Sequence, residues 1–183
     1  QLADTEGLWA GEMSPALRYP IAVARLMSCL YIGDTRRASA AAHECMVLAD
    51  RLPVAQIPWL DSELHFLCGR VALLCDDRGT VAEAARRIAR LRWPAVQGYS
   101  DLLNAALASR DSTTERAEQL LNDALLRFDE TGTTHFVMIA KFRLGQILGP
   151  RRGHTLISEA ITWCQGQGVA DAERMFNYLA PWA

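Results

Sequence analysis

The sequence predicts an all-α protein built from antiparallel helix pairs. Apolar residues recur every three or four positions along almost the whole chain, for example at Ile21, Ala24 and Met27, and this is the spacing of one face of a helix. No segment alternates between apolar and polar residues as a half-buried strand does. Half of the 183 residues are hydrophobic, which is typical of a folded domain. A chain of this length buries about 70% of its unfolded surface, so we expect a single domain over residues 1–183.

Glycine, proline and aspartate mark where the helices end. Pro53 and Pro94 are firm boundaries, because proline lacks an amide donor and disfavours helix in the residue before it. Asp34, Asp111 and Thr133 can each cap the helix that follows with a side-chain oxygen. These boundaries predict about nine helices. They form four pairs and a final helix, at residues 14–52, 57–93, 95–131, 133–168 and 170–180.

The pairs repeat one plan. In the first two pairs, the segments LYIGDTRRASAAA and LLCDDRGTVAEAA each contain an apolar helix end, a turn with glycine and aspartate, and an alanine five residues beyond a glycine. Small residues at such positions let two antiparallel helices approach closely. In the third pair, small and apolar residues occupy the offsets 0, 3, 12, 16 and 19, at Ala105, Ala108, Ala117, Leu121 and Ala124.

The stretch LGPRRGHT in the fourth pair has two glycines with basic residues between them, like a phosphate-binding loop. A Walker-type loop needs the pattern GxxxxGK[ST] after a strand. Here Gly149 and Gly153 are one residue too close, and His154 takes the place of the lysine. We therefore interpret the stretch as the turn between two helices. Arg151 and Arg152 then lie at a helix N-terminus, where they could hold an anion, with solvated turn arginines as the alternative.

No catalytic or metal site can be assembled from the sequence. His65, Cys68 and Cys75 share one helix face, but no fourth ligand with zinc-site spacing accompanies them, so we interpret them as packing residues. A nucleophile, a base and an orienting acid cannot be placed together either. We expect no enzymatic activity, no metal and no cofactor.

Charge, hydropathy and cysteine usage exclude further classes. The net charge of −2 gives no electrostatic reason to expect nucleic acid as a partner. The longest apolar stretch, Ile21 to Gly33, is far shorter than the roughly 20 residues of a membrane span. The five cysteines lack the spacing of a disulfide framework, so we expect reduced thiols and a cytoplasmic location. Because the chain begins at Gln1 without a signal segment, we expect it to be a piece of a longer protein.

These helix pairs resemble tetratricopeptide-type repeats of the irregular, longer kind found in bacterial signalling ATPases and in transcriptional activators of the maltose-regulon type. The tail from Phe142 is similar to the C-terminal end of large bacterial proteins that carry a kinase or cyclase domain, an ATPase and then such repeats. The equivalent small positions Gly69, Ala105 and Gly145 are 36 and 40 residues apart, where the family has 34. The resemblance implies a right-handed stack of antiparallel helix pairs, an α-α superhelix, with a concave groove.

In such a stack the first helix of each pair lines the groove. The family offsets point to eight candidate partner-binding residues: Glu63, Phe66, Arg70, Tyr99, Ser109, Arg110, Phe142 and Gln146. The resemblance implies a non-catalytic interaction or regulatory module that binds a protein, a peptide or another domain of its parent chain. A small-molecule effector-sensing domain of a transcriptional or ATPase regulator is the first alternative, and an enzyme on a helical scaffold is the second.

The last expected helix is amphipathic. The segment ADAERMFNYL places Met175, Phe176 and Leu179 on one stripe, opposite its charged residues. A repeat stack ends in an exposed apolar face unless a further helix covers it. We therefore expect this segment to cap the fourth pair and not to be the binding site. The residues that it is expected to cover are Leu156, Ile157 and Ile161.

Overall fold

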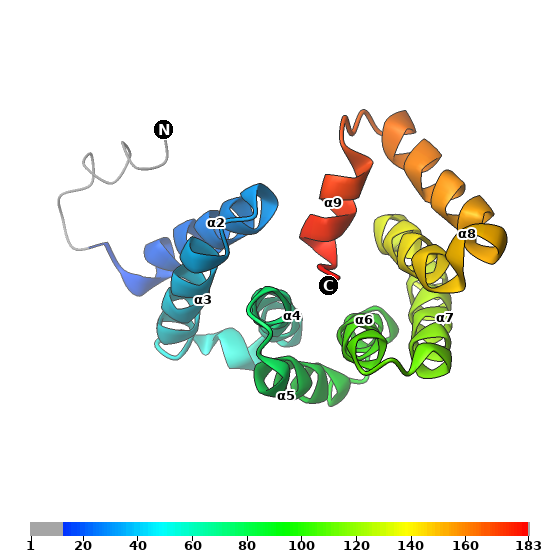
Figure 1. Ribbon diagram of the computed structural model, residues 1–183. Coiled ribbons are helices and arrows are strands. Elements are labelled where there is room, and N and C mark those ends of the chain that lie inside the picture. The colour runs from blue at the N-terminus through cyan, green and yellow to red at the C-terminus, as the bar shows by residue number, and fades with distance from the viewer. Residues whose placement is uncertain (1–12, 183) are drawn as a thin grey trace.

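The computed structural model describes residues 13–182. Over these residues the chain forms α-helices, one short 3-10 helix and no strand, so the predicted all-α class is confirmed for this part (Figure 1). None of the helices found here is both long and apolar enough to cross a membrane. The elements are α2 (Pro15–Ile32), α3 (Thr35–Ala49), η1 (Pro53–Gln56), α4 (Pro58–Leu74), α5 (Arg78–Ala89), α6 (Pro94–Arg110), α7 (Thr114–Glu130), α8 (Thr134–Gly166) and α9 (Ala172–Leu179).

The helix starts agree with only part of the expected capping. The Asp34 carboxylate accepts a hydrogen bond at 3.0 Å from an amide in the first turn of α3, as expected. The other two caps are wrong. Asp111 ends α6 and pairs with Arg78, and the Thr133 hydroxyl lies 3.0 Å from that of Thr131. The N-cap residue of α7 is instead Thr113, whose hydroxyl donates to the Ala108 carbonyl oxygen, and α7 and α8 both begin without a side-chain cap.

Small residues lie where the paired helices approach one another. The helices pack as α2 with α3, α4 with α5, and α6 with α7, and short turns join the two members of each pair. A Cβ atom on Gly69 of α4 would lie 2.8 Å from Leu103 Cδ1 on α6 and 3.3 Å from Ala84 Cβ on α5. Ala105 and Ala117 are fully buried. The missing side chain at Gly69 thus sets the spacing of three helices.

The helix α8 is bent back on itself at Gly149, whose φ of 73° and ψ of 178° are not helical. The break divides α8 into a first arm, 134–148, and a second arm, 150–166. The arms cross closely, since a Cβ atom on Gly153 would lie 1.9 Å from the Gly145 carbonyl oxygen. Lys141 and Glu159 also join the arms, with 2.8 Å between Nζ and Oε2. The arms are therefore antiparallel, and within the stretch LGPRRGHT the chain reverses at Gly149 and then begins the second arm.

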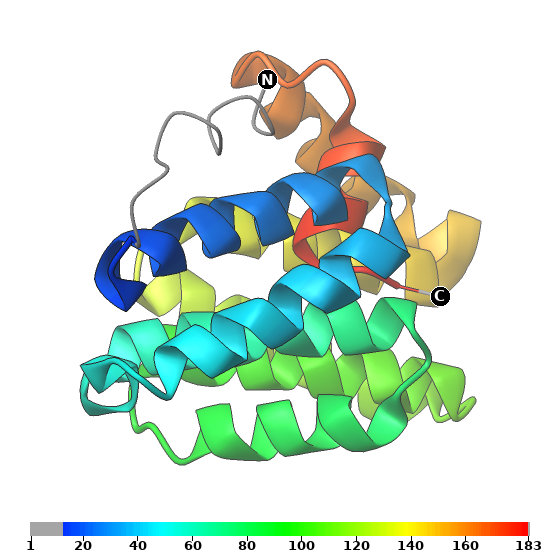
Figure 2. The same ribbon diagram turned by 90° about the vertical axis from the view of Figure 1, so that its left-hand side faces the viewer.

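The pairs follow one another around an arc that runs from α2 and α3 to α8 (Figure 1). The helices α2, α4, α6 and the first arm of α8 face the inside of the arc, and α3, α5 and α7 lie on its outside. Figure 2 shows neighbouring helices running roughly alongside one another. The buried apolar residues form two clusters, one around α2 and α3 and one from α4 to α9, and α4 contributes to both. A curved wall of packed helices results, with its hollow side inward.

The final helix lies elsewhere than expected. Instead of covering the second arm of α8, α9 runs back along the inside of the arc (Figure 1). Its Phe176 ring stacks on Phe142 of the first arm, and its Arg174 Nε donates a hydrogen bond at 3.0 Å to the Tyr31 carbonyl oxygen at the end of α2. Ile157, which α9 was expected to cover, packs on Gly145 instead. Because the two arms of α8 bury each other, the apolar stripe of α9 is free to bury itself against the inner wall.

Candidate functional site

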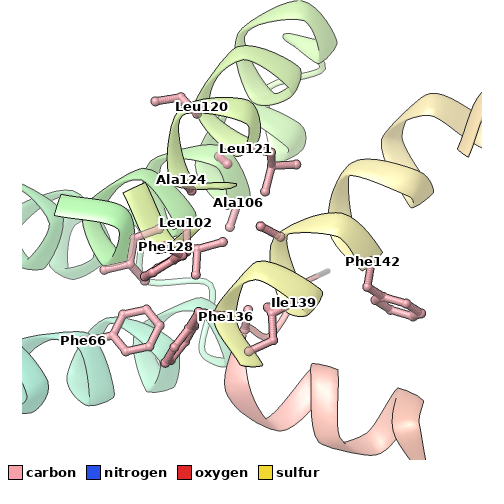
Figure 3. Packing of buried hydrophobic residues seen from close by; sticks show 14 of the residues in the cluster. Phe66, Leu102, Ala106, Leu120, Leu121, Ala124, Phe128, Phe136, Ile139 and Phe142 are labelled. Atoms are coloured by element: carbon pink, nitrogen blue, oxygen red, sulfur yellow. The ribbon is translucent and has the colours of Figure 1, made fainter. Parts of the chain in front are cut away.

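Four aromatic rings pack against one another on the inner side of the arc. Phe66 of α4, Tyr99 of α6, Phe128 of α7 and Phe136 of α8 contact one another with ring centroids 4.6 to 5.8 Å apart, and three of these rings are labelled in Figure 3. Aromatic pairs of this kind add about 0.5–1.5 kcal/mol each beyond area burial. Phe66 is only 4% exposed. Phe66 and Tyr99, both candidate partner residues, thus chiefly hold the wall together.

The inner wall is occupied by the chain's own C-terminal segment. We call residues 172–182, which comprise α9 and the residues up to Trp182, the tail. The rings of Phe176 and Phe142 stack with centroids 4.4 Å apart. The Trp182 indole donates a hydrogen bond at 3.2 Å to the Ser109 hydroxyl of α6. Two of the candidate partner residues, Phe142 and Ser109, therefore contact the tail.

Arg143, on the first arm of α8, binds the end of the tail. Its side chain is almost fully buried. Its Nη2 atom donates to the Ala180 carbonyl oxygen at 2.6 Å and to Asn177 Oδ1 at 2.7 Å. Its Nη1 atom donates to Gln146 Oε1 at 2.8 Å, and the guanidinium lies 5.6 Å from the Trp182 ring centroid. Gln146, a candidate partner residue, thus orients the arginine and does not contact the tail through a hydrogen bond of its own.

Arg70, on α4, reaches the same end of the tail from the facing wall. It is 3% exposed, and its Nη1 atom lies 3.5 Å from the Leu179 carbonyl oxygen, a long hydrogen bond. The guanidinium is 5.3 Å from the centroid of Phe66 and 5.0 Å from that of Tyr178, within cation–π range. The Nε and Nη2 atoms of Arg70 make no hydrogen bond of good geometry. Arg70 is thus a buried cation that has only weak hydrogen bonding.

Neither arginine has a carboxylate beside it. No carboxylate oxygen of the described residues lies within 4.0 Å of either guanidinium. Burial lowers the pKa of Arg143 to about 10, although Glu173 opposes this shift. Burial also lowers the pKa of Arg70, against the effects of Tyr178 and Glu63. The C-terminal end of α9 carries a partial negative charge, which compensates part of these two positive charges.

The other two candidate partner residues, Arg110 and Glu63, form no hydrogen bond or ion pair with the tail. Arg110 donates to the Leu73 carbonyl oxygen at 2.6 Å and pairs with Asp76 at 2.8 Å. It therefore joins α6 to the turn that follows α4. Glu63 is exposed on α4, and its charge raises the pKa of Tyr99, after the larger effect of burial. Its carboxylate thus adds negative potential beside the aromatic cluster.

The candidate anion site and the candidate zinc residues are placed as follows. Arg151 is exposed, whereas Arg152 pairs with Glu118 of α7 at 3.3 Å. His65 Nε2 lies 3.3 Å from Asp61 Oδ1, and Arg87 binds the same carboxylate. Across residues 13–182, no three His, Cys, Asp or Glu side chains are grouped so that they could hold a metal ion. Arg152 thus joins α8 to α7, and Arg87 joins α5 to α4 through Asp61.

Two cavities flank the tail. One, of about 370 Å³, is bordered by Ser109, Arg143, Gln146, Asn177 and Trp182. The other, of about 460 Å³, lies between α9 and the C-terminal ends of α2 and α4. Between these cavities the tail is held by the Phe176 stack, the two arginines, the edge contact of Tyr178 with Tyr31, and the hydrogen bonds of Arg174 and Trp182.

Sequence reasoning missed Arg143 and the tail residues that face it. Arg143 stands between the apolar residues Phe142 and Leu144, and a charged residue between two apolar neighbours in a helix is the pattern that could have identified it. Asn177 and Trp182 were missed because the last helix was assigned to the end of the stack. Only the three-dimensional arrangement brings these residues to one place.

Comparisons of the chain with protein-family models, with curated proteins and with solved structures give no match. The geometry of the inner wall and of the tail that occupies it is therefore the basis for inferring a function.

Proposed function

We propose that this chain is a non-catalytic protein-interaction module whose concave inner wall binds a polypeptide segment of a partner. One observation carries the proposal: the wall already holds a polypeptide, because Arg143 and Arg70 approach consecutive main-chain carbonyl oxygens at Ala180 and Leu179. Main-chain carbonyls belong to every polypeptide, so this mode of binding transfers readily from the tail to another chain. Aromatic and arginine side chains are also the usual anchors of protein interfaces.

The occupant takes the form of a short amphipathic helix laid into a groove, a recurrent mode of peptide recognition. Its apolar anchor is Phe176, which is 1% exposed, and its polar end lies between the two arginines. The wall spans several pairs, since the tail bonds to Tyr31 of α2 and to Ser109 of α6. A binding surface made by successive helix pairs is the arrangement that repeat modules use.

The finer features of the proposal follow from the resemblance in the sequence. The curved array is a tetratricopeptide-like right-handed stack, and the module belongs to a larger bacterial signalling protein. Its partner is another protein or another domain of the parent chain. We also propose a cytoplasmic location, which is supported by five cysteines that are all unpaired.

A small-molecule effector is the second candidate ligand. The cavity of about 370 Å³ beside Arg143 supports it, since ligand sites are concave and contain a few convergent polar groups. A polypeptide accounts for more of the wall, because the cavity touches neither Arg70 nor the Phe142 stack.

The test is an exchange experiment on the folded full chain. A protease recognition sequence is inserted between Val169 and Ala170, in the connection between α8 and α9, and the protein is cut only after folding. We expect the cut tail to stay bound through size-exclusion chromatography. A fluorescent peptide of residues 170–183 should then replace it, with saturable fluorescence anisotropy. Loss of the tail on cutting, with no binding of the peptide to a chain that circular dichroism shows to be folded, would contradict the proposal.

A further inference from the structure

The two arginines at the end of the tail approach the carbonyl oxygens of two consecutive residues. Arg70 approaches the carbonyl oxygen of Leu179, and Arg143 binds that of the next residue, Ala180. Both side chains are more than nine-tenths buried. Two positive charges are thus removed from water at one point of the groove, where the tail offers them only uncharged acceptors.

Three other arginines of the described residues each have an aspartate as counter-ion. Arg87, Arg110 and Arg127 each lie within about 3 Å of an aspartate oxygen, at 3.1, 2.8 and 2.8 Å. All three are more exposed than Arg70 and Arg143. Arg70 and Arg143, the two most deeply buried arginines of the described residues, thus have no carboxylate oxygen within 4.0 Å, although a buried charge gains most from a counter-ion.

Hydrogen-bond capacity also remains unused. The Nε and Nη2 atoms of Arg70 and the Nε atom of Arg143 are buried and make no hydrogen bond of good geometry, although the Tyr178 side chain opposes the lowering of the Arg70 pKa by burial. A carboxylate offers about four lone-pair sites and can bind a guanidinium through two parallel hydrogen bonds, whereas a main-chain carbonyl offers two lone pairs. The site is thus chemically suited to a more negative occupant than the tail.

On the basis of the proposed function, we propose that the cognate occupant is an acidic helical segment of a partner chain, which places carboxylates on Arg143 and Arg70 and displaces the tail. The tail, which offers the two arginines only neutral hydrogen-bond acceptors, keeps the groove filled until such a segment arrives. Its Asn177, whose Oδ1 atom receives a hydrogen bond from Arg143, stands where the partner carries aspartate or glutamate.

A polypeptide fits these observations better than a small acid does. The contacts that hold the tail extend from Tyr31 of α2, past Arg70 and Ser109, to Phe142 of α8. A segment as long as the tail can satisfy both arginines and also bury an aromatic anchor. A small dicarboxylate in the cavity beside Arg143 would leave that aromatic wall uncovered.

Covalent attachment makes displacement selective. A segment joined by a short linker competes at an effective concentration in the millimolar range, so a weak ligand cannot remove the tail. A partner must bind the groove more tightly than the tail does, and ion pairs with two buried arginines supply such a difference. Competition from the attached tail therefore restricts binding to acidic segments, which bind the groove more tightly.

The experiment compares three peptides of residues 170–183 as competitors for the labelled tail on the cut full chain. The first has the natural sequence, the second carries Asn177→Asp, and the third carries Ala170→Asp, which adds the same charge at an exposed position. We expect the Asn177→Asp peptide to bind about tenfold more tightly than the natural one, since a neutral hydrogen bond becomes charge-assisted. The Ala170→Asp peptide should bind like the natural one. In a cut chain with Arg143→Gln, the preference should disappear.

The outcomes separate the two proposals. If the natural peptide binds and Asn177→Asp binds no more tightly than Ala170→Asp, the acidic partner is wrong and the polypeptide groove stands. If no peptide binds, both proposals fall. If millimolar succinate releases the labelled tail as well as the Asn177→Asp peptide does, the occupant is a small acid and the acidic segment is again wrong. Where Arg143→Gln prevents folding, the peptide comparison alone decides.

Discussion

Replacement of Phe176 by alanine removes the ring that anchors the tail to the wall. The side chain is 1% exposed and its ring is nearly parallel to that of Phe142, at 28° and 4.4 Å between centroids. A phenylalanine buries about 150–250 Å², which at about 25 cal/mol per Å² corresponds to about 4–6 kcal/mol as an upper limit. Phenylalanine-to-alanine changes in protein cores typically cost about 3–5 kcal/mol. We therefore predict that Phe176→Ala lowers the free energy of unfolding by about 3 kcal/mol or more.

Urea unfolding followed by circular dichroism measures this loss. Leu126→Ala is the matched control, because Leu126 is 62% exposed and such a change shifts stability by less than about 0.5 kcal/mol. Combining Phe176→Ala with Phe142→Ala should give a coupling energy of about 0.5–1.5 kcal/mol for the stacked pair. A loss below about 1 kcal/mol for Phe176→Ala, or zero coupling, would refute the placement of the tail.

Three further predictions concern the wall itself. Ala117→Phe should destabilise the protein by about 1–3 kcal/mol through overpacking of a fully buried position, and an unchanged melting temperature would mean that α6 and α7 are packed differently. Gly153→Ala should cost at least as much, about 2 kcal/mol, because its Cβ atom would lie 1.9 Å from the Gly145 carbonyl oxygen; a melting curve like that of the natural protein would exclude the tight crossing of the α8 arms. Burial lowers the pKa of His65 and of His135, so below about pH 6.5 the unfolded chain binds protons that the folded chain does not. The free energy of unfolding should thus be greatest above that pH and fall as the pH decreases toward 5. Urea titrations should show a smaller fall for a variant with both histidines changed to glutamine, and a fall as large as that of the natural protein would contradict this prediction.

Much of the wall could be predicted from the sequence, because its construction is local. Helical periodicity and proline boundaries depend on neighbouring residues, and they place α4 and α6 with starts at Pro58 and Pro94, each within one residue of the expected position. The bend at Gly149 follows from a glycine and a proline in sequence. Small residues such as Gly69 and Ala117 mark close approaches that any stacking of pairs would need.

The site could be predicted only in part, because it is made by a contact between distant segments. The offsets of the repeat that the sequence resembles pointed to Arg70, Ser109 and Phe142 as partner-binding residues, which stays a prediction; in the structure these three residues contact the tail. The offsets said nothing of what would occupy the inner wall. An amphipathic helix can bury its stripe at the end of a stack or inside it, and the pattern around Phe176 is the same in both cases. Which of the two placements forms depends on how well the apolar face of α9 fits the end of the stack and the inner wall.

The most direct test of the account is hydrogen exchange on the intact, uncut chain, with and without a saturating amount of the Asn177→Asp peptide. The account predicts that the amides of α9 are protected in the chain alone, since Phe176 and the two arginines hold the tail in place. Added peptide should remove this protection while the amides of α6 and α7 keep theirs. Unchanged protection of α9 with the peptide bound, or loss of protection throughout the chain, would contradict the claim that the tail occupies the binding groove.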